Sequence, residues 1–423
     1  MKQTDLSPIR KKYKKSFGSL SESVAFTLGS GKIIIFKEKL MSLPTLIDMM
    51  GQLIKAPSIS SSQNHWDMSN KAVIELLEGW LSHLGFKCEV IKLAGPLEKY
   101  NLIATLGEGE GGLVLSGHTD TVPYDEGRWQ SDPFTLTERE QKLFGLGTCD
   151  MKGFFAIVLD AIKDMCDSPI KQPLIVLATA DEESSMNGAR ALVQSDKLKA
   201  KYALIGEPTS LTPIYAHKGI MMERIRVTGK SGHSSNPNLG TNAMDAMHAV
   251  MSELMAFRQE LKQKYSNGDF AIDYPTLNLG CIHGGDSPNR ICAGCDIDFD
   301  LRALPGMSNQ ALVAEIQQRL PAIAEKTGTK IQLEHLFPDV PSFATSLESD
   351  IVKACEKLTN KKADTVAFAT EGPFLNQMGM ETLVLGPGSI DQAHQPNEFL
   401  ALDQINPMQD LIRSLVRRYC LEA

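Results

Sequence analysis

The sequence lacks any run of 18 or more apolar residues, the length at which a transmembrane helix becomes a candidate. Its eight cysteines are scattered over 423 residues, too dilute for the disulfide framework of a small secreted protein. Basic residues are not in excess, since 43 Lys and Arg face 51 Asp and Glu and the formal net charge is −8. These absences argue against a membrane-spanning protein, a disulfide scaffold and a nucleic-acid-binding protein, and they make the cytoplasm the expected location.

What is present is the composition of an ordinary globular protein, with 42% hydrophobic and 22% charged residues. The length predicts two or three domains. Residues 1–41 stand apart because five basic residues cluster between Arg10 and Lys15, and the one short apolar run, residues 33–36, is too short for a secretory signal. We predict a flexible extension there: a solvated tail, a basic targeting segment, or residues ahead of a start at Met41.

From residue 42 onward, helix and strand patterns alternate along the chain. This alternation predicts an α/β fold with a mainly parallel mixed sheet and helices on both faces. Helices are expected at residues 72–85 and 154–165. Four short runs of Leu, Val and Ile have the composition of strands buried on both faces, at residues 113–116, 174–179, 202–205 and 382–385.

Near Gly219 the pattern changes to that of a small α+β domain. Strands are expected at residues 222–228, 276–282 and 291–301, and helices at residues 242–265 and 309–326. We therefore predict a larger domain formed by residues 42–218 and 334–423, with a smaller domain inserted over residues 219–333. The alternation of residues 291–301 puts Cys292 and Cys295 on opposite faces of a strand, which argues against a zinc knuckle.

Side chains of the kind that bind metals follow the predicted buried strands. Ligands in open parallel sheets bind beyond the carboxyl ends of the strands, so these side chains are expected to converge. Taken singly, each has an ordinary explanation, as a surface histidine, a solvated acidic pair or a helix N-cap; together they indicate one site. They are His118 and Asp120 after the first strand, Glu182 and Glu183 after the second, Glu207 after the third, His394 after the fourth, and Asp150 just ahead of a predicted helix.

Histidine and carboxylate ligands together suit zinc or a neighbouring first-row ion rather than calcium. Two histidines and three carboxylates exceed the three protein ligands of a usual catalytic zinc, and they suit two ions about 3.5–4 Å apart. With Asp150 as the bridge, each ion receives one histidine, one terminal carboxylate and one oxygen of Asp150. Asp120 could then accept the second ring N–H of His118, and Glu182 could act as a general base in metal-assisted hydrolysis.

Seven motifs give the chain after Met41 a family resemblance. It resembles the dinuclear zinc aminoacylase and carboxypeptidase-type metallopeptidase family. The resemblance implies a catalytic metal-binding domain for residues 42–218 and 334–423, and a lid and dimerisation domain for residues 219–333. It also implies a homodimer with two divalent metal ions per subunit, zinc being the expected ion and cobalt able to substitute. The motifs are GLVLSGHTDTVP at 112–123, GLGTCDMKGFF at 145–155, ATADEE at 178–183, IGEPTS at 205–210, HKG at 217–219, SGHSS at 231–235 and GPGSIDQAHQP at 386–396.

Position by position, the resemblance puts His118 and Glu207 on one ion and Glu183 and His394 on the other. Asp150 bridges the two ions. By the same resemblance Glu182 is the general base and acid, and Asp120 orients His118.

In the inserted domain, the resemblance gives His233 the task of stabilising the developing oxyanion, often from the partner chain. It assigns Asn289 and Arg302 to the substrate carboxylate, which a guanidinium can hold through two parallel hydrogen bonds. Without the resemblance, His233 would be a surface residue in a Gly/Ser loop. Arg302 would equally well form an ion pair with Asp298 or Asp300.

The longer motifs are specific to the branch of the family that hydrolyses N2-acetyl-L-ornithine to L-ornithine and acetate in arginine biosynthesis. They imply a small-molecule N-acyl amino acid as partner, rather than a nucleic acid or a membrane. Sister activities on succinyl-diaminopimelate or acetylcitrulline would use the same metals, and composition does not separate them. A catalytically silent metal-binding dimer that senses amino acids is an alternative of another class. An intact Glu182 speaks against it, because a pure binder has no use for a base beside the ions.

Overall fold

The computed structural model describes residues 25–27, 33–35, 43–195 and 197–422. The chain divides into two compact units, Met1–Pro44 and Thr45–Ala423. The first contains an antiparallel pair of strands, β1 (Ala25–Thr27) and β2 (Ile33–Ile35). The basic cluster at residues 10–15 and the alternative start at Met41 lie outside the described residues, so the predictions about the extension stay predictions.

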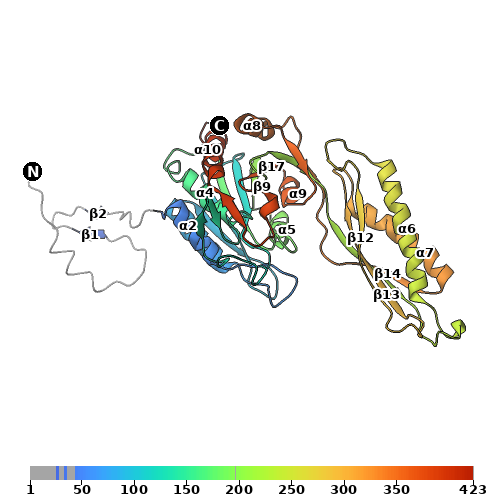
Figure 1. The fold of residues 1–423 in the computed structure, drawn as a ribbon. Helices are drawn as coiled ribbons and strands as arrows, with labels where there is room; N and C mark the ends of the chain where they lie inside the picture. The colour runs from blue at the N-terminus through green and yellow to red at the C-terminus, as the bar shows by residue number, and fades with distance from the viewer. Residues whose placement is uncertain (1–24, 28–32, 36–42, 196, 423) are drawn as a thin grey trace, which may run out of the picture. The chain divides into compact units, whose positions relative to one another are not determined.

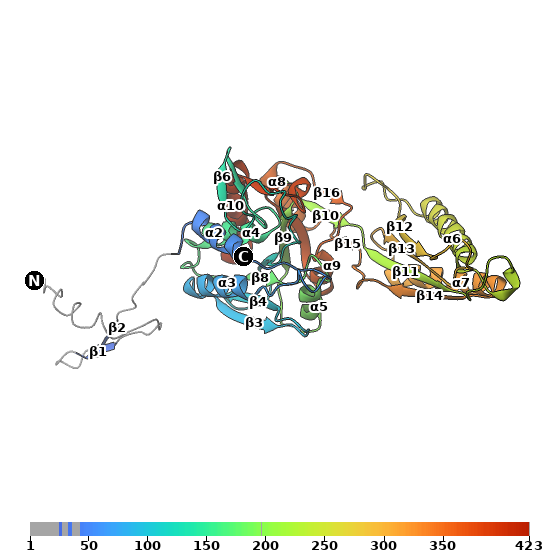
Figure 2. The same cartoon turned by 60° about the horizontal axis from the view of Figure 1, so that its bottom comes forward.

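The second unit contains a nine-stranded mixed sheet (Figures 1 and 2). The four central strands, third to sixth in the order given below, run parallel to one another. Antiparallel pairs lie on both sides of them. This confirms the predicted α/β class and the four predicted buried strands. In order, the strands are β15 (Phe343–Ala344), β10 (Ile214–His217), β17 (Glu381–Gly386), β9 (Tyr202–Pro208), β5 (Leu113–His118), β8 (Leu174–Thr179), β4 (Tyr100–Leu106) and β3 (Lys87–Lys92), with β16 (Asp364–Val366) paired to β10.

Helices cover both faces of this sheet (Figure 2). They are α2 (Leu46–Lys55), α3 (Lys71–His83), α4 (Lys152–Ile162), α5 (Asn187–Val193), α8 (Asp350–Thr359), α9 (Gly372–Gln377) and α10 (Ile405–Val416). On one face, Leu192 of α5 and Leu375 of α9 share a core with Val114 of β5. On the other face, Gly206 of β9 lies against Phe154 of α4. Nearly every residue of α4 is buried, which explains its apolar sequence.

The stretch between β10 and β15 forms a separate four-stranded antiparallel sheet, in the order β12 (Thr276–Gly284), β13 (Gly294–Arg302), β11 (Met221–Thr228) and β14 (Lys330–His335). Helices α6 (Ala243–Lys264) and α7 (Asn309–Thr327) pack against it. Buried and part-exposed residues alternate along β11 and β13, as expected for a sheet covered on one face. This sheet spans residues 221–335, and its assignment as a lid and dimerisation domain over 219–333 stays a prediction.

The structure corrects the prediction for the cysteine pair. Strand β13 begins at Gly294, so residues 291–293 precede the ladder and do not follow its alternation. Cys292 and Cys295 are both buried in the same hydrophobic core, not on opposite faces. All eight cysteines are free. Within the described ranges, the groups of side chains able to hold a metal ion contain no cysteine.

A third, small sheet of three strands joins the C-terminal part of the chain to the segment ahead of α4. It has the order β18 (Phe399–Ala401), β7 (Lys142–Phe144) and β6 (Thr137–Arg139). In the described part of the chain, no helix has both the length and the hydropathy needed to cross a membrane.

Candidate metal centre

The structure brings the five predicted metal ligands together at the carboxyl ends of the central strands. His118 is the last residue of β5, and Glu207 lies near the end of β9. Glu183 follows β8, and Asp150 lies in the turn before α4. His394 follows the short 3-10 helix η2 (Ile390–Gln392), beyond the end of β17. Parallel strands therefore deliver side chains that are far apart in the sequence to one edge of the sheet.

Asp150 lies between the two histidines. Its Oδ1 is 3.0 Å from Nε2 of His118, and its Oδ2 is 3.5 Å from Nε2 of His394. On the first side, Nε2 of His118 is also 3.8 Å from Oε1 of Glu207; on the second, Nε2 of His394 is 3.0 Å from Oε2 of Glu183. Each oxygen of Asp150 thus faces one histidine that has a second carboxylate beside it.

The residues present fit a pair of divalent ions. Two overlapping groups have ligand atoms within 4.8 Å of one another: His118 with Asp150 and Glu183, and His118 with Glu182 and Glu207. Oε1 of Glu183 is buried without a hydrogen-bond partner. Burying this many carboxylates is costly unless cations compensate them, and histidine with carboxylate is a ligand set that zinc accepts.

The pKa values show how strongly the groups of the site interact. Burial opposes the charged form of His118, but the Asp150 hydrogen bond and the neighbouring carboxylates raise its pKa well above the usual value. Hydrogen bonds to Asp150 and Glu183 raise the pKa of His394 to about 10. Burial opposes ionisation of Asp150, yet the two histidines lower its pKa. Burial, followed by the charge of Glu207, raises the pKa of Glu182 well above its usual value.

Asp120 contacts its neighbours differently from the predicted arrangement. Nδ1 of His118 lies 3.0 Å from the backbone carbonyl oxygen of Asp120 and 3.7 Å from its carboxylate. The Asp120 carboxylate instead accepts the backbone N–H groups of Glu182 at 3.3 Å and Glu183 at 3.1 Å. Asp120 therefore contacts the histidine through its main chain and holds the turn of the two glutamates through its side chain.

Sequence reasoning missed a cluster of ion pairs around a buried lysine next to this turn. Nζ of Lys99 is 2.7 Å from carboxylate oxygens of both Asp67 and Asp181, and the Lys99 side chain is 5% exposed. The hydroxyl of Ser60 donates to the same oxygen of Asp181 at 3.0 Å. Asp181 has a φ of 61° and directly precedes the two glutamates. The cluster therefore anchors the start of their turn, and no local motif marks Lys99 as its partner.

Two buried glutamates near the site were also missed. Glu371 accepts a hydrogen bond from the Thr179 hydroxyl at 2.9 Å, its other oxygen has no partner, and burial raises its pKa to about 7. Glu398 accepts backbone N–H groups from the turn that contains Asp150. Both are acidic residues at fully buried positions, so the signal that could have revealed them is a lone carboxylate in a segment otherwise suited to the interior.

The predicted oxyanion donor His233 and the two predicted substrate-binding residues, Asn289 and Arg302, lie in the four-stranded sheet and its loops. Nδ1 of His233 is 2.7 Å from the Ser235 hydroxyl, and the next backbone N–H, of Ser234, donates to the carbonyl of Asn289 at 3.1 Å. Nε of Arg302 donates to Asp300 at 2.8 Å, the ion pair considered as an alternative. Among the described residues, no hydrogen bond or ion pair joins these three to the metal-type ligands, so their roles stay predictions.

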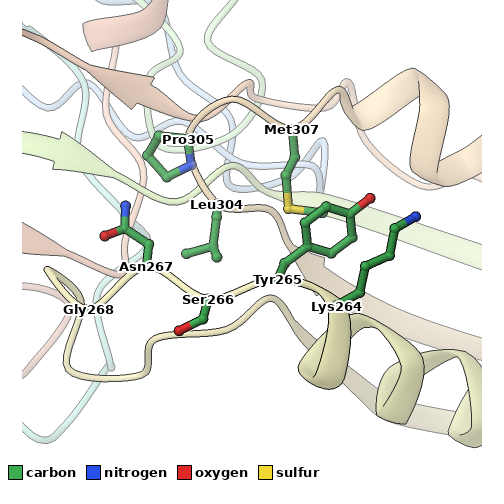
Figure 3. Close-up of a pocket in the computed structure, with 8 residues that line it drawn as sticks. All are labelled: Lys264, Tyr265, Ser266, Asn267, Gly268, Leu304, Pro305 and Met307. Carbon is green, nitrogen blue, oxygen red and sulfur yellow. The ribbon is translucent and has the colours of Figure 1, made fainter.

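A pocket of about 450 Å³ lies elsewhere, where the end of α6 meets the segment after β13 (Figure 3). It is lined by residues 264–268 together with Leu304, Pro305 and Met307. None of the predicted site residues lines this pocket, so the pocket is not part of the candidate metal centre.

Comparison with known proteins identifies relatives along nearly the whole chain. The model of peptidase family M20/M25/M40 matches residues 114–418. The chain is 50% identical over 378 residues to acetylornithine deacetylase of Pasteurella multocida (strain Pm70), covering 89% of this chain and 99% of that protein. It is 48% identical over 381 residues to acetylornithine deacetylase of Photorhabdus laumondii, covering 90% of this chain and 99% of that protein.

Solved structures show the same fold at low identity. A tripeptidase from Staphylococcus aureus superposes with a TM-score of 0.69 at 19% identity, covering 88% of this chain and 98% of that one. A dinuclear metal binding peptidase of the M20 family from Bacillus subtilis gives a TM-score of 0.61 at 14% identity, covering 88% and 97%. Family model, relatives and fold agree. The chain belongs to peptidase family M20/M25/M40.

Proposed function

We propose that this protein is a metal-dependent amidohydrolase that converts N2-acetyl-L-ornithine and water to L-ornithine and acetate, a step of arginine biosynthesis. The observation that carries the reaction type is Asp150, whose two oxygens each face a histidine and a further carboxylate. The choice of substrate is supported by acetylornithine deacetylases about half identical to this chain over nearly their full length.

In this proposal His118 and Glu207 would hold one divalent ion and Glu183 and His394 a second, and Asp150 would contribute to both. The short distance within each pair supports the assignment. Zinc is the expected ion and cobalt a substitute, because both accept imidazole and carboxylate ligands. When bound, such ions polarise an acyl oxygen and lower the pKa of a shared water towards about 7.

The chain's own residues then move the proton and place the substrate. Glu182, next to His118 and Glu207, accepts the proton of the attacking water and returns it to the departing amine. Because Asp120 holds the backbone of Glu182, it fixes where that carboxylate points. His233 donates to the developing oxyanion. The substrate carboxylate is held by Asn289 and by Arg302, which would exchange its contact with Asp300.

The proposal includes a homodimer formed through the inserted domain, residues 219–333, with residues 42–218 and 334–423 as the catalytic domain. Strand β12 supports this, since it is an edge strand of the four-stranded sheet and Ile282 on it is 52% exposed. An exposed strand edge can pair with a second chain. A cytoplasmic location is supported by the eight free cysteines, which suit a reducing compartment.

An acetate- and succinate-release assay tests the function. Purified protein is given acetylornithine, acetylcitrulline or succinyl-diaminopimelate, with chelator, without it, and with zinc or cobalt restored. We expect the highest kcat/KM on acetylornithine, loss of turnover with chelator, and recovery with either metal. A higher kcat/KM on another substrate would favour a sister deacylase. Binding without turnover of any substrate would favour the silent metal-binding dimer.

A further inference from the structure

Glu398 contacts the turn that carries Asp150 through an unusual number of hydrogen bonds. This glutamate is 1% exposed and directly precedes β18. Its Oε1 accepts the backbone N–H groups of Gly147 at 3.1 Å, Cys149 at 2.8 Å and Asp150 at 3.0 Å. Its Oε2 accepts the Gly147 N–H at 3.0 Å. One carboxylate thus receives three N–H groups from four consecutive residues.

The main chain brings the two segments side by side. Strand β18 pairs with β7, with Phe399 opposite Phe144, and the N–H of Gly145 donates to the carbonyl of Glu398 at 3.1 Å. Glu398 and Gly147 are 251 positions apart in the sequence. His394 lies four positions before Glu398, on the same segment. The side chain of Glu398 therefore connects the segment of one metal-type ligand to the turn of another.

A carboxylate binds this turn more strongly than an amide of the same shape. A glutamine has the same shape but presents an NH₂ group, a donor, at one of the two oxygen positions. At the Oε2 position that donor would face the Gly147 N–H, and the remaining oxygen would accept the three N–H groups without a charge. A hydrogen bond to a charged group contributes about 1.5–3 kcal/mol, against about 0.5–1.5 kcal/mol for one between neutral groups. The turn would then relax, and the direction of the Asp150 backbone, which sets the direction of its carboxylate, would change.

We propose that Glu398 is a positioning residue that fixes the Asp150 turn against the His394 segment, so that both are in place to bind the ions. The inference rests on the metal centre of the proposed function. Groups that orient metal ligands in this way typically change metal affinity by about 10- to 100-fold when they are replaced.

The test compares E398Q with E223Q. Glu223 is equally buried but lies on β11, where it pairs with His335 and touches no metal-type ligand, so it controls for the loss of a buried carboxylate. Metal-free wild-type protein and both variants are titrated with zinc by calorimetry, and the cobalt forms are compared by visible absorption spectra. We expect E398Q to bind zinc about 10- to 100-fold more weakly and to shift the cobalt bands, while E223Q matches wild type.

Wild-type zinc affinity together with an unchanged cobalt spectrum in E398Q would overturn the inference. Should E398Q fail to fold, E398D replaces it: the shorter side chain keeps the charge but withdraws the oxygens, and the same two readouts apply with the same expected and overturning results. The proposed function is judged separately, because a wild type that binds two ions but does not release acetate from acetylornithine would reject the reaction while leaving the role of Glu398 standing.

Discussion

At the scale of single residues, Glu182 is the group whose charge matters most to the proposed reaction. E182Q keeps the shape of the side chain and its backbone contact with Asp120, but it removes the base. We expect kcat to fall by about 10²–10⁴-fold, with zinc content and KM close to wild type. Steady-state kinetics and metal analysis on the same preparation check this. Near-normal turnover would remove Glu182 from the mechanism.

Glu371 gives a second residue-scale prediction, concerning pH. Burial raises the pKa of this carboxyl from 4.5 to about 7, so the folded protein holds the proton more tightly than the unfolded chain. Stability is therefore lost as the pH rises from about 4.5 to about 7, by up to about 3 kcal/mol. E371Q removes this loss. The difference in unfolding free energy between E371Q and wild type should therefore favour E371Q more at pH 8 than at pH 5.

Urea denaturation of metal-free wild-type and E371Q protein at the two pH values measures the difference. The metal-free form is required because bound cations would favour the ionised carboxyl. Identical pH dependence in the two proteins would show that Glu371 does not carry a raised pKa.

The convergence of the metal-type side chains could be predicted from the sequence, whereas their supporting contacts could not. His118 and Glu207 could be predicted because each ends an apolar run, and the ends of parallel strands meet. The contacts of Glu398 depend on a partner 251 positions away, which no local pattern encodes. For Asp120, spacing placed the residue beside His118 but could not distinguish its carbonyl oxygen from its carboxylate.

At the scale of elements, long and strongly patterned segments were predictable and short ones were not. The predicted strand at 174–179 agrees with β8 residue for residue. Strands β10, β15 and β16 have only two to four residues and no alternation long enough to read. Strand β13 starts later than predicted because residues 291–293 keep the alternating composition without joining the ladder, and α4 stops at Ile162 rather than near residue 165.

The start of α4 yields a prediction about the element that supports Asp150. A Cβ on Gly153 would lie 2.3 Å from the backbone oxygen of Thr148, in the turn that leads to Asp150. G153A must therefore displace that turn, and we expect a loss of about 1–3 kcal/mol in unfolding free energy together with weaker zinc binding. Urea denaturation and zinc titration measure both effects.

Gly79 provides the matched control, because it lies inside α3 and a Cβ there would have no neighbour within 4 Å. G79A should gain up to about 1 kcal/mol from helix propensity and leave zinc binding unchanged. Equal effects of the two substitutions would mean that the close approach of Gly153 to the turn has no bearing on the site.

At the scale of the whole molecule, the candidate metal centre combines side chains that are spread along the sequence from His118 to His394. The inserted sheet lies in the sequence between two of them, Glu207 and His394. The residues that would hold metal thus lie on or next to strands of the nine-stranded sheet, and those that would hold substrate lie on or next to strands of the four-stranded sheet. His233 is exposed in a loop of the inserted sheet, with Ser235 as its hydrogen-bond partner. A histidine in this exposed loop is able to complete a site on another subunit of the proposed dimer. Such an arrangement can be recognised from the activity of dimers that contain two different variants.

Two inactive variants should then restore each other. H233A lacks the oxyanion donor, a loss of about 10²–10³-fold in kcat, and E182Q lacks the base. When the two are unfolded and refolded together in equal amounts, half the dimers are mixed, and each mixed dimer has one site with Glu182 from one chain and His233 from the other. Turnover should recover to about a quarter of wild type, given random pairing in a two-fold dimer. If His233 serves its own subunit, no site in the mixture has both groups, and turnover stays at the level of the separate variants.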